Sequence, residues 1–353
     1  MDTKRKRIEW IDIAKGIGIL LVSAGHTITL TYSYPIYTFH MPLFFFLSGL
    51  LLRPTDDGVM TYIKKISQKI LYPWAVMFVI SFMICLAIPT WRHGLTMHNF
   101  IYDIYTSNTN IVQNSSLWYL VCYFWVLIYV LFYHKIKKSK LKTIILVFLL
   151  FVTLFLPDLQ NEISNNLIKL PGNRLPFKID SAMIGLVFII LSEKFKKKVM
   201  DLPCGLKKFS VRMFGFSIIV LSCTCINGWC NMNSLDFGNH KILYYPIALI
   251  GISLICIYSQ WISSSDFCSL KRILCFYGKN SLIIFGFQSL LIRLYLLVFN
   301  NIQGLGMKLY ADNPVAHQIG CFLFVTFIGT PFVVFLYKWS KKKMMSYCTF
   351  GNV

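Results

Sequence analysis

The chain has 353 residues, of which 56% are hydrophobic, 16% aromatic and only 14% charged. Soluble domains carry about 25% charged residues, so this composition excludes a water-soluble enzyme and indicates a polytopic membrane protein. The formal net charge of +21 would suit a nucleic-acid partner, but most Lys and Arg residues lie in every second gap between apolar segments. That distribution is typical of membrane topology, and we expect no nucleic-acid binding.

Ten segments can be read as membrane-spanning helices, each of which needs about 20 mostly apolar residues. The fifth and sixth are the shortest. The sequence therefore predicts an all-α fold, a polytopic transmembrane helix bundle of about ten spans that forms one integral-membrane domain over residues 1–353. The predicted spans are 12–31, 36–52, 70–89, 115–134, 143–157, 179–193, 211–227, 243–261, 279–299 and 318–338.

The Lys and Arg residues also predict the orientation, because cytoplasmic loops carry an excess of both. With the N-terminus inside, alternate gaps hold most of the basic residues. We expect both termini in the cytoplasm and a multi-pass protein of the plasma (inner) membrane. The predicted cytoplasmic segments are 1–11, 53–69, 135–142, 194–210 with Arg212, 262–278 and 338–353, and the outer basic residues are Arg92, Lys169, Arg174, Lys178, Lys241 and Lys308.

Eleven cysteines are present, without a CxxC motif and without the Cys/His spacing of a zinc site. Most lie inside apolar segments, where cysteine behaves as a small hydrophobic residue. Cys225 and Cys230 fall near a predicted outer loop and are close enough in sequence to pair. We expect no metal site.

The first predicted span contains polar residues that lipid disfavours, at about 2.5–3.5 kcal/mol for a charge at the helix centre. Lys15 and His26 are separated by close to three helical turns, so both lie on one face, about 16 Å apart along the axis. Asp12 precedes Lys15 by one turn and can pair with it, and Ser23 precedes His26 by one turn. Ionisable groups inside a membrane are usually functional, so this stripe is a candidate site.

The second predicted span brings another histidine to the same level. His40 lies near its outer end, and the short connection from the first span makes His26 and His40 neighbours. Histidine has an unperturbed pKa near 6.5, which suits proton transfer. A structural explanation also stays open, since Lys15 can extend its side chain to the membrane boundary and a neighbouring helix can satisfy His26.

Several stretches resemble one known family. The basic residue and histidine of the first span, followed by FHMPLFFFLSG at 39–49, are similar to the acyltransferase-3 family of membrane O-acyltransferases, and especially to its fucose 4-O-acetylase-like branch. The resemblance covers about residues 8–340. The other similar stretches are SSLWYLVCYFW at 115–125, RLPFKIDSAMIGLVFIILSE at 174–193 and YGKNSLIIFGFQSLLI at 277–292.

This resemblance implies a membrane O-acetyltransferase that moves an acetyl group from acetyl-CoA to a sugar hydroxyl of a cell-surface polysaccharide or its lipid-linked precursor. Acetyl-CoA is then a co-substrate, no cofactor is tightly bound, and the partners are acetyl-CoA, the glycan acceptor and membrane lipids. His26 would act as the general base, and Asp12 and Lys15 would organise the donor end. His40 would be a second group for proton transfer or positioning.

Further residues are candidates for substrate binding. Trp118 and Tyr119 can stack on a sugar ring or belong to an interfacial aromatic belt. Arg174 and Asp180, at the outer mouth of the sixth span, can bind sugar hydroxyls or form a solvated pair. Ser48, like Ser23, can accept the acyl group transiently, or it can serve helix packing together with Gly49. Arg293 in the ninth span can bind an acidic group or form an interhelical pair. The other candidates, in or near the GKNSL segment, are Asn280, Ser281 and Gln288.

Two positions depart from the family pattern. The basic residue of the first span is usually Arg, and Lys15 keeps the charge but lacks the planar guanidinium. Gln288 stands where His is frequent, and an amide cannot transfer a proton at neutral pH.

Two other classes of function stay open. A transporter or flippase for a glycolipid or another anionic substrate suits ten spans with buried charges, although no matching pair of interrupted helices marks an inverted repeat. A structural partner in an envelope complex could use the polar stripe to hold helices together.

Overall fold

The computed structural model describes residues 7–28, 34–92, 95–200, 206–301 and 313–350. Within them the regular elements are helices, with one isolated antiparallel bridge between Asn231 and Asp236, so the all-α prediction is confirmed there. The α-helices are α1 (Glu9–Thr27), α2 (Tyr34–Leu51), α3 (Val59–Ile66), α4 (Tyr72–Ala87), α5 (Pro89–Arg92), α6 (Met97–Thr106), α7 (Trp118–Lys135), α8 (Ser139–Asn166), α9 (Ile179–Met200), α10 (Leu206–Asn227), α11 (Tyr244–Ser264), α12 (Cys268–Lys279), α13 (Ser281–Asn301), α15 (Pro314–Leu323) and α16 (Thr330–Phe350).

Seven helical stretches in the described part of the chain are long and apolar enough to cross a membrane, as expected of a polytopic membrane protein. Two shorter apolar helices, Pro35–Leu51 and Ser217–Asn227, coincide with the second and seventh predicted spans, and α1 coincides with the first. The number of ten spans stays a prediction. The seven stretches are Val59–Ala87, Ser115–Lys135, Ser139–Asn166, Pro171–Met200, Lys241–Ser264, Ser281–Phe299 and Pro314–Ser340.

The fifth and sixth predicted spans were placed too short. The fifth corresponds to α8, which begins before residue 143 and continues past residue 157, with Pro157 inside it. The sixth corresponds to α9, which begins at Ile179 as predicted but runs on to Met200. Helix propagation adds one backbone hydrogen bond for each residue, so a helix does not end where its apolar residues end.

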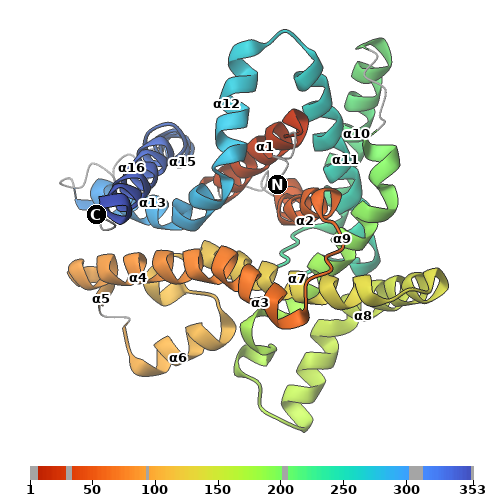
Figure 1. Cartoon of the computed structure of the whole chain (residues 1–353), viewed down its shortest axis with the longest axis horizontal. Helices are drawn as coiled ribbons and strands as arrows, with labels where there is room; N and C mark the ends of the chain where they lie inside the picture. The colour runs from red at the N-terminus through yellow and green to blue at the C-terminus, as the bar shows by residue number, and fades with distance from the viewer. Residues whose placement is uncertain (1–6, 29–33, 93–94, 201–205, 302–312, 351–353) are drawn as a thin grey trace.

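The segment 262–278, predicted only as a cytoplasmic connection, contains α12, which packs along α1 (Figure 1). Leu274 and Cys275 of α12 are buried in a small apolar cluster with Ile13 of α1 and Ile262 of α11. Ile273, on the other face of α12, is exposed. One face of α12 is therefore buried and the other exposed, and the buried face covers the first half of α1.

The backbones of α1 and α12 touch at two glycines. A methyl group at Gly16 would lie 2.1 Å from the carbonyl oxygen of Leu274, and one at Gly278 would lie 1.8 Å from the carbonyl oxygen of Asp12. A carbon atom cannot approach an oxygen this closely, so both positions require glycine. Membrane helices use such small residues to bring their backbones together, and here they fix the polar end of α1.

α2 fills the space between α1, α9 and α11. Phe39 of α2 lies against Gly251 of α11, where a methyl group would be 2.4 Å from the phenyl ring. Gly49 of α2 lies against Ser192 of α9, where a methyl group added at Gly49 would be 2.0 Å from the hydroxyl oxygen of Ser192. Close packing on several sides therefore fixes the position of α2 and of His40 on it.

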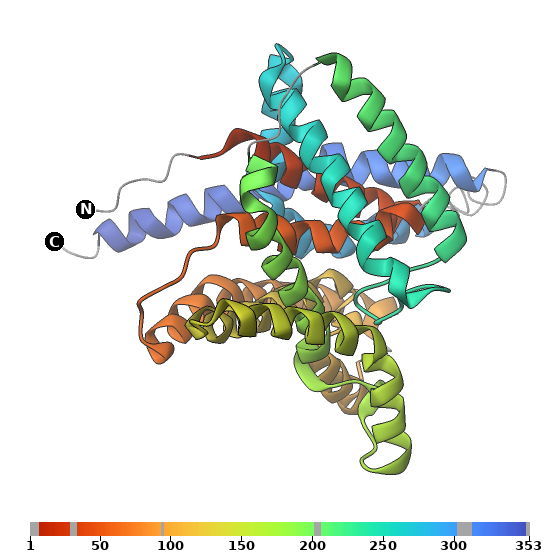
Figure 2. The same cartoon turned by 90° about the vertical axis from the view of Figure 1, so that its right-hand side faces the viewer.

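Segments predicted on the same side of the membrane contact one another. On the predicted outer side, the Tyr105 hydroxyl donates to the carbonyl of Arg174 at 3.3 Å. On the predicted cytoplasmic side, the Ser263 hydroxyl donates to the carboxylate of Glu9 at 3.0 Å. The start of α1 and the end of α16 both lie at the left of Figure 2. These contacts agree with the predicted alternation, while the assignment of one side to the cytoplasm stays a prediction.

We expect Gly278→Ala to push α12 away from α1, because the added methyl group meets backbone atoms that cannot yield. Overpacking of this kind costs about 1–3 kcal/mol, which should appear as a lower melting temperature of the purified protein in detergent. Gly58→Ala is the control, since nothing lies within 4 Å of a methyl group there. Identical melting of the two variants would contradict the close approach.

Candidate active site

Tyr37 of α2 lies between the two histidines at the predicted outer end of α1 and α2. Its hydroxyl oxygen is 3.3 Å from Nδ1 of His26. Its ring centroid is 5.8 Å from that of His26 and 4.9 Å from that of His40, and both ring pairs meet edge-on. His26 and His40 are thus neighbours through Tyr37, as the short connection between the spans predicts. We call these three residues the histidine–tyrosine cluster.

The hydrogen bond of His40 fixes where its proton lies. Nδ1 of His40 is 2.8 Å from the carbonyl oxygen of Ile36, one turn earlier in α2. A carbonyl only accepts, so Nδ1 donates, and Nε2 of the neutral ring keeps its lone pair. The Tyr37 hydroxyl can donate or accept, so His26 can adopt either neutral tautomer.

The loop between α10 and α11 closes over the histidine–tyrosine cluster. The ring centroids of Trp229 and Tyr37 are 4.2 Å apart. Next to Trp229, the buried thiol of Cys230 accepts from the side chain of Asn227 at 3.2 Å, and burial raises the pKa of this thiol. Cys230 and the exposed Cys225 are both free thiols, so the pairing considered from the sequence is not formed.

Asp12 does not pair with Lys15, contrary to the expectation from their spacing. The Asp12 carboxylate lies 2.8 Å from Nε of Arg7, and the described residues contain no ion pair between Asp12 and Lys15. Arg7 lies in the segment before α1, and its planar guanidinium matches the carboxylate geometry better than an ammonium does. Lys15 lies one turn further along α1 and is half-buried.

Arg174 and Asp180 form a buried ion pair at the mouth of α9. Nε of Arg174 is 2.6 Å from Oδ2 of Asp180, and Asp180 is 0% exposed. The same oxygen accepts from Gln160 at 3.0 Å, and Oδ1 accepts from the backbone N–H of Ser181 at 2.6 Å. The solvated pair considered from the sequence is wrong, because α8 and the loop after α10 cover both groups.

The ion pair and the histidine–tyrosine cluster share one loop. Nη1 of Arg174 donates to the carbonyl of Asn233 at 2.9 Å, and Asn233 follows Trp229 in the loop between α10 and α11. Nearby, Nζ of the buried Lys178 donates to Asn108 at 2.6 Å. Segments far apart in the sequence therefore converge around the mouth of α9.

The aromatic candidates of α7 lie in the interior of the bundle. Trp118 is 6% exposed. The ring of Tyr119 is nearly parallel to that of Tyr123, with centroids 5.9 Å apart, and lies 5.1 Å from that of Phe285. The hydroxyls of Ser48 and Tyr123 are hydrogen-bonded. These residues are not an exposed aromatic belt, and their role toward a sugar stays a prediction.

The candidates near the C-terminus occupy different environments. Asn280 is buried and donates to a carbonyl in the last turn of α12 at 2.7 Å, and Ser281 begins α13. Gln288 is 0% exposed, and its amide has no hydrogen-bond partner among the described residues. Arg293 is exposed, so the structure does not bring it into the interior with the other candidates.

No group of three or more His, Cys, Asp or Glu side chains that could hold a metal occurs among the described residues. Tyr37, Trp229 and Lys178 were not predicted from the sequence as site residues. Tyr37 had a local signal, since it lies one turn before His40 on the same helix. Trp229 had none, because only the tertiary fold brings the loop after α10 to α2.

The family model of the acyltransferase domain, acyltransferase-3, matches residues 8–338, which is nearly the whole chain. The chain therefore belongs to this family, and it is a membrane acyltransferase. The match confirms the family to which the motifs in the first two spans point. No curated protein and no solved structure matches the chain.

We expect Asp180→Asn to destabilise the fold strongly, because it leaves the guanidinium of Arg174 without its charge partner. Breaking a buried pair costs about 3–5 kcal/mol, which thermal unfolding in detergent should show. The matched control is Asp158→Asn, which removes the exposed pair between Lys241 and Asp158, 2.6 Å apart, at a cost of about 1 kcal/mol or less. An equal loss of stability in the two variants would show that the pair of Arg174 and Asp180 stabilises the fold no more than the exposed pair does.

Proposed function

We propose that this membrane acyltransferase moves an acetyl group from acetyl-CoA to a hydroxyl of a cell-surface polysaccharide or its lipid-linked precursor, with His26 as the general base. The observation that supports this most directly is the histidine–tyrosine cluster in the first two spans of a family member. Histidine is the most frequent base in such proton transfers. The resemblance to the fucose 4-O-acetylase-like branch favours acetyl as the acyl group and a sugar as the acceptor.

In the proposed reaction, the sugar hydroxyl oxygen attacks the acetyl carbonyl carbon while its proton passes to Nε2 of His26. The C–S bond of the thioester then breaks, and the leaving CoA thiolate takes the proton from His26. The products are the O-acetyl sugar and CoA with a free thiol. For Nε2 to accept a proton, Nδ1 must donate to the Tyr37 hydroxyl, so Tyr37 positions the ring of His26 and selects its tautomer.

His40 has a separate part in this proposal. The carbonyl of Ile36 holds the proton on Nδ1, so Nε2 can accept a hydrogen bond from a second hydroxyl of the acceptor or relay a proton. Because close packing of α2 fixes His40, it would orient the sugar without moving itself.

The donor end of the proposal lies at the cytoplasmic start of α1, because acetyl-CoA is made in the cytoplasm. Lys15 and Arg7 supply positive charge for the phosphates of CoA, and Asp12 holds Arg7 in place. The polar stripe of α1 then leads from Lys15 toward His26, about 16 Å further along the helix axis. The pantetheine arm of acetyl-CoA would lie along this face of α1 and bring the thioester to His26.

A second feature on the predicted cytoplasmic side supports a phosphate-bearing donor. A cavity of about 290 Å³ lies between the ends of α2 and α7, and its lining includes Arg53, Lys135 and Lys137. The positive-inside rule alone accounts for these charges in sequence, but the fold gathers them around one cavity. They would add to the attraction of the CoA phosphates.

The acceptor side of the proposal is organised by the loop between α10 and α11. Arg174 and Asp180 are too buried to be an open sugar site, and they act on the acceptor through this loop, which Arg174 holds by the carbonyl of Asn233. Membrane lipids would contact the exposed apolar residues of helices such as α8, including Val147, Phe148 and Phe151.

We expect His26→Gln to lower acetyl transfer by about 10²–10⁴-fold, the usual contribution of a general base. The measurement is the transfer of labelled acetyl from acetyl-CoA to surface glycan in isolated membranes, corrected for the amount of protein. Tyr37→Phe should cost about tenfold or less, since it removes one hydrogen bond and keeps the ring.

The control for this experiment is His240→Gln, which changes an exposed histidine of the loop between α10 and α11 and should leave the transfer rate unchanged. Wild-type transfer by His26→Gln, with normal membrane insertion, would show that His26 is not the base. Transport of a glycolipid without any need for acetyl-CoA would favour the transporter class instead.

We expect Lys15→Gln to raise the KM for acetyl-CoA by about tenfold or more, because a hydrogen bond to a charged group contributes about 1.5–3 kcal/mol. Lys15→Arg should keep the KM, since it restores the side chain most frequent in the family. The KM of each variant is obtained from initial rates of acetyl transfer in isolated membranes at varied acetyl-CoA concentration. An unchanged KM in Lys15→Gln would remove Lys15 from the donor site.

A further inference from the structure

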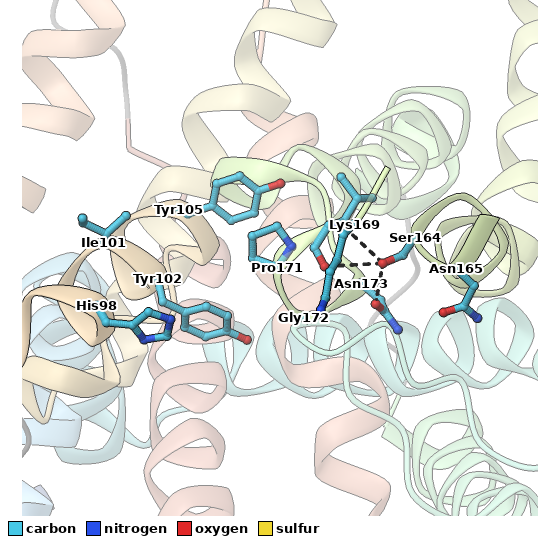
Figure 3. Close-up of a pocket in the computed structure, with 11 residues that line it drawn as sticks. His98, Ile101, Tyr102, Tyr105, Ser164, Asn165, Lys169, Pro171, Gly172 and Asn173 are labelled. Atoms are coloured by element: carbon cyan, nitrogen blue, oxygen red, sulfur yellow. Dashed lines mark hydrogen bonds between the residues drawn. The ribbon is translucent and has the colours of Figure 1, made fainter. Parts of the chain in front are cut away.

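A cavity of about 820 Å³ opens between α6 and the turn that joins α8 to α9 (Figure 3). Tyr102 and Tyr105 of α6 line one side, and Ser164, Asn165 and residues 169–173 line the other. Its volume lies within the range of about 300–1,000 Å³ that is usual for small-molecule sites. In the predicted topology it faces the outer side of the membrane. We call it the outer cavity.

Hydrogen bonds fix the wall of the outer cavity that the turn forms. The Ser164 hydroxyl donates to the side chain of Asn173 at 2.7 Å and accepts from the backbone N–H of Leu170 at 3.1 Å. Gly172 has a φ of +62°, and a methyl group there would lie 2.6 Å from the hydroxyl oxygen of Tyr102. Glycine therefore lets the turn and the hydroxyl end of Tyr102 come together, as Figure 3 shows.

Polar groups at the rim of the outer cavity are free to meet a ligand. The side chains of Asn165 and Lys169 are exposed, and no described residue forms a hydrogen bond or an ion pair with either. Tyr102 is 37% exposed. The lining contains no carboxylate, and Lys169 gives it a positive charge.

These groups match the chemistry of a carbohydrate. A sugar ring offers an apolar C–H face to an aromatic ring such as that of Tyr102, whose amphipathic character suits contacts of this kind. Sugar hydroxyls pair with an amide such as that of Asn165, and Lys169 suits an acidic or phosphorylated sugar. We propose that the outer cavity binds an oligosaccharide segment of the acceptor, away from the hydroxyl that reacts, and this rests on the proposed function.

A series of direct contacts connects the outer cavity to the histidine–tyrosine cluster. The Tyr105 hydroxyl donates to the carbonyl of Arg174, and the guanidinium of Arg174 donates to the carbonyl of Asn233. Asn233 lies in the loop that places Trp229 on the ring of Tyr37. A polymer held in the outer cavity can therefore present its next sugars to this loop and to the cluster beneath it.

The test compares short and long acceptors with the full-length protein in membranes. The probes are oligosaccharides of two sugars and of six or more sugars, released from the surface glycan of a strain that lacks this gene. The wild type should have the lower KM for the long acceptor. Tyr102→Ala and Lys169→Gln should each raise that KM about tenfold, the loss of roughly one polar or ring contact, with an unchanged kcat and an unchanged KM for the short acceptor.

The controls make the same substitutions elsewhere. Tyr72→Ala changes a tyrosine of α4 that is 66% exposed, and Lys140→Gln changes an exposed lysine at the start of α8. Both should keep the wild-type KM for each acceptor. Equal effects of Tyr102→Ala on short and long acceptors, or a loss of kcat without a change of KM, would overturn the assignment.

A binding measurement separates this proposal from the proposed function. Titration of the purified protein with the long oligosaccharide, followed by saturation-transfer NMR, should give a Kd about tenfold higher for Tyr102→Ala than for the wild type, whether or not acetyl transfer occurs. The oligosaccharide could instead be displaced from the protein by phosphatidylglycerol vesicles and stay bound when phosphatidylcholine vesicles are added. That result would overturn the carbohydrate assignment and identify a site for anionic lipid headgroups.

Discussion

The direct contact between the backbones of α1 and α12 is the constraint on which the polar half of the molecule depends. At Gly16 and Gly278 no side chain separates the two backbones, so α12 covers the start of α1 at the level of Asp12. Asp12 then meets Arg7 rather than Lys15. The charged end of α1 is thereby held in one arrangement, and the same helix carries His26 about three turns beyond Lys15.

A second constraint operates at the other end of the bundle. The loop between α10 and α11 touches α2 through Trp229 and the mouth of α9 through Asn233. Arg174 donates to the carbonyl of Asn233 in this loop and is held in turn by the fully buried carboxylate of Asp180. Charges are costly to bury, and here the pair of Arg174 and Asp180 positions the loop between α10 and α11 against the histidine–tyrosine cluster.

The sequence alone predicted the all-α fold, the location of the long apolar helices and the proximity of His26 to His40. Those predictions rest on apolar runs and short connections, which are local signals. It missed α12, because its buried face is short and lies in a segment too polar to be a span. It also missed the contact of Trp229 with Tyr37, since only the tertiary fold brings a loop after α10 to α2.

The most direct test of the proposed acetyl transfer is mass spectrometry of surface glycans from cells with the gene, without it, and with His26→Gln expressed at a normal level in the membrane. If His26 is the base, glycan sugars carry an acetyl-sized mass in the wild type alone. Glycans of identical mass in all three strains would contradict it, and so would full acetylation in the His26→Gln strain.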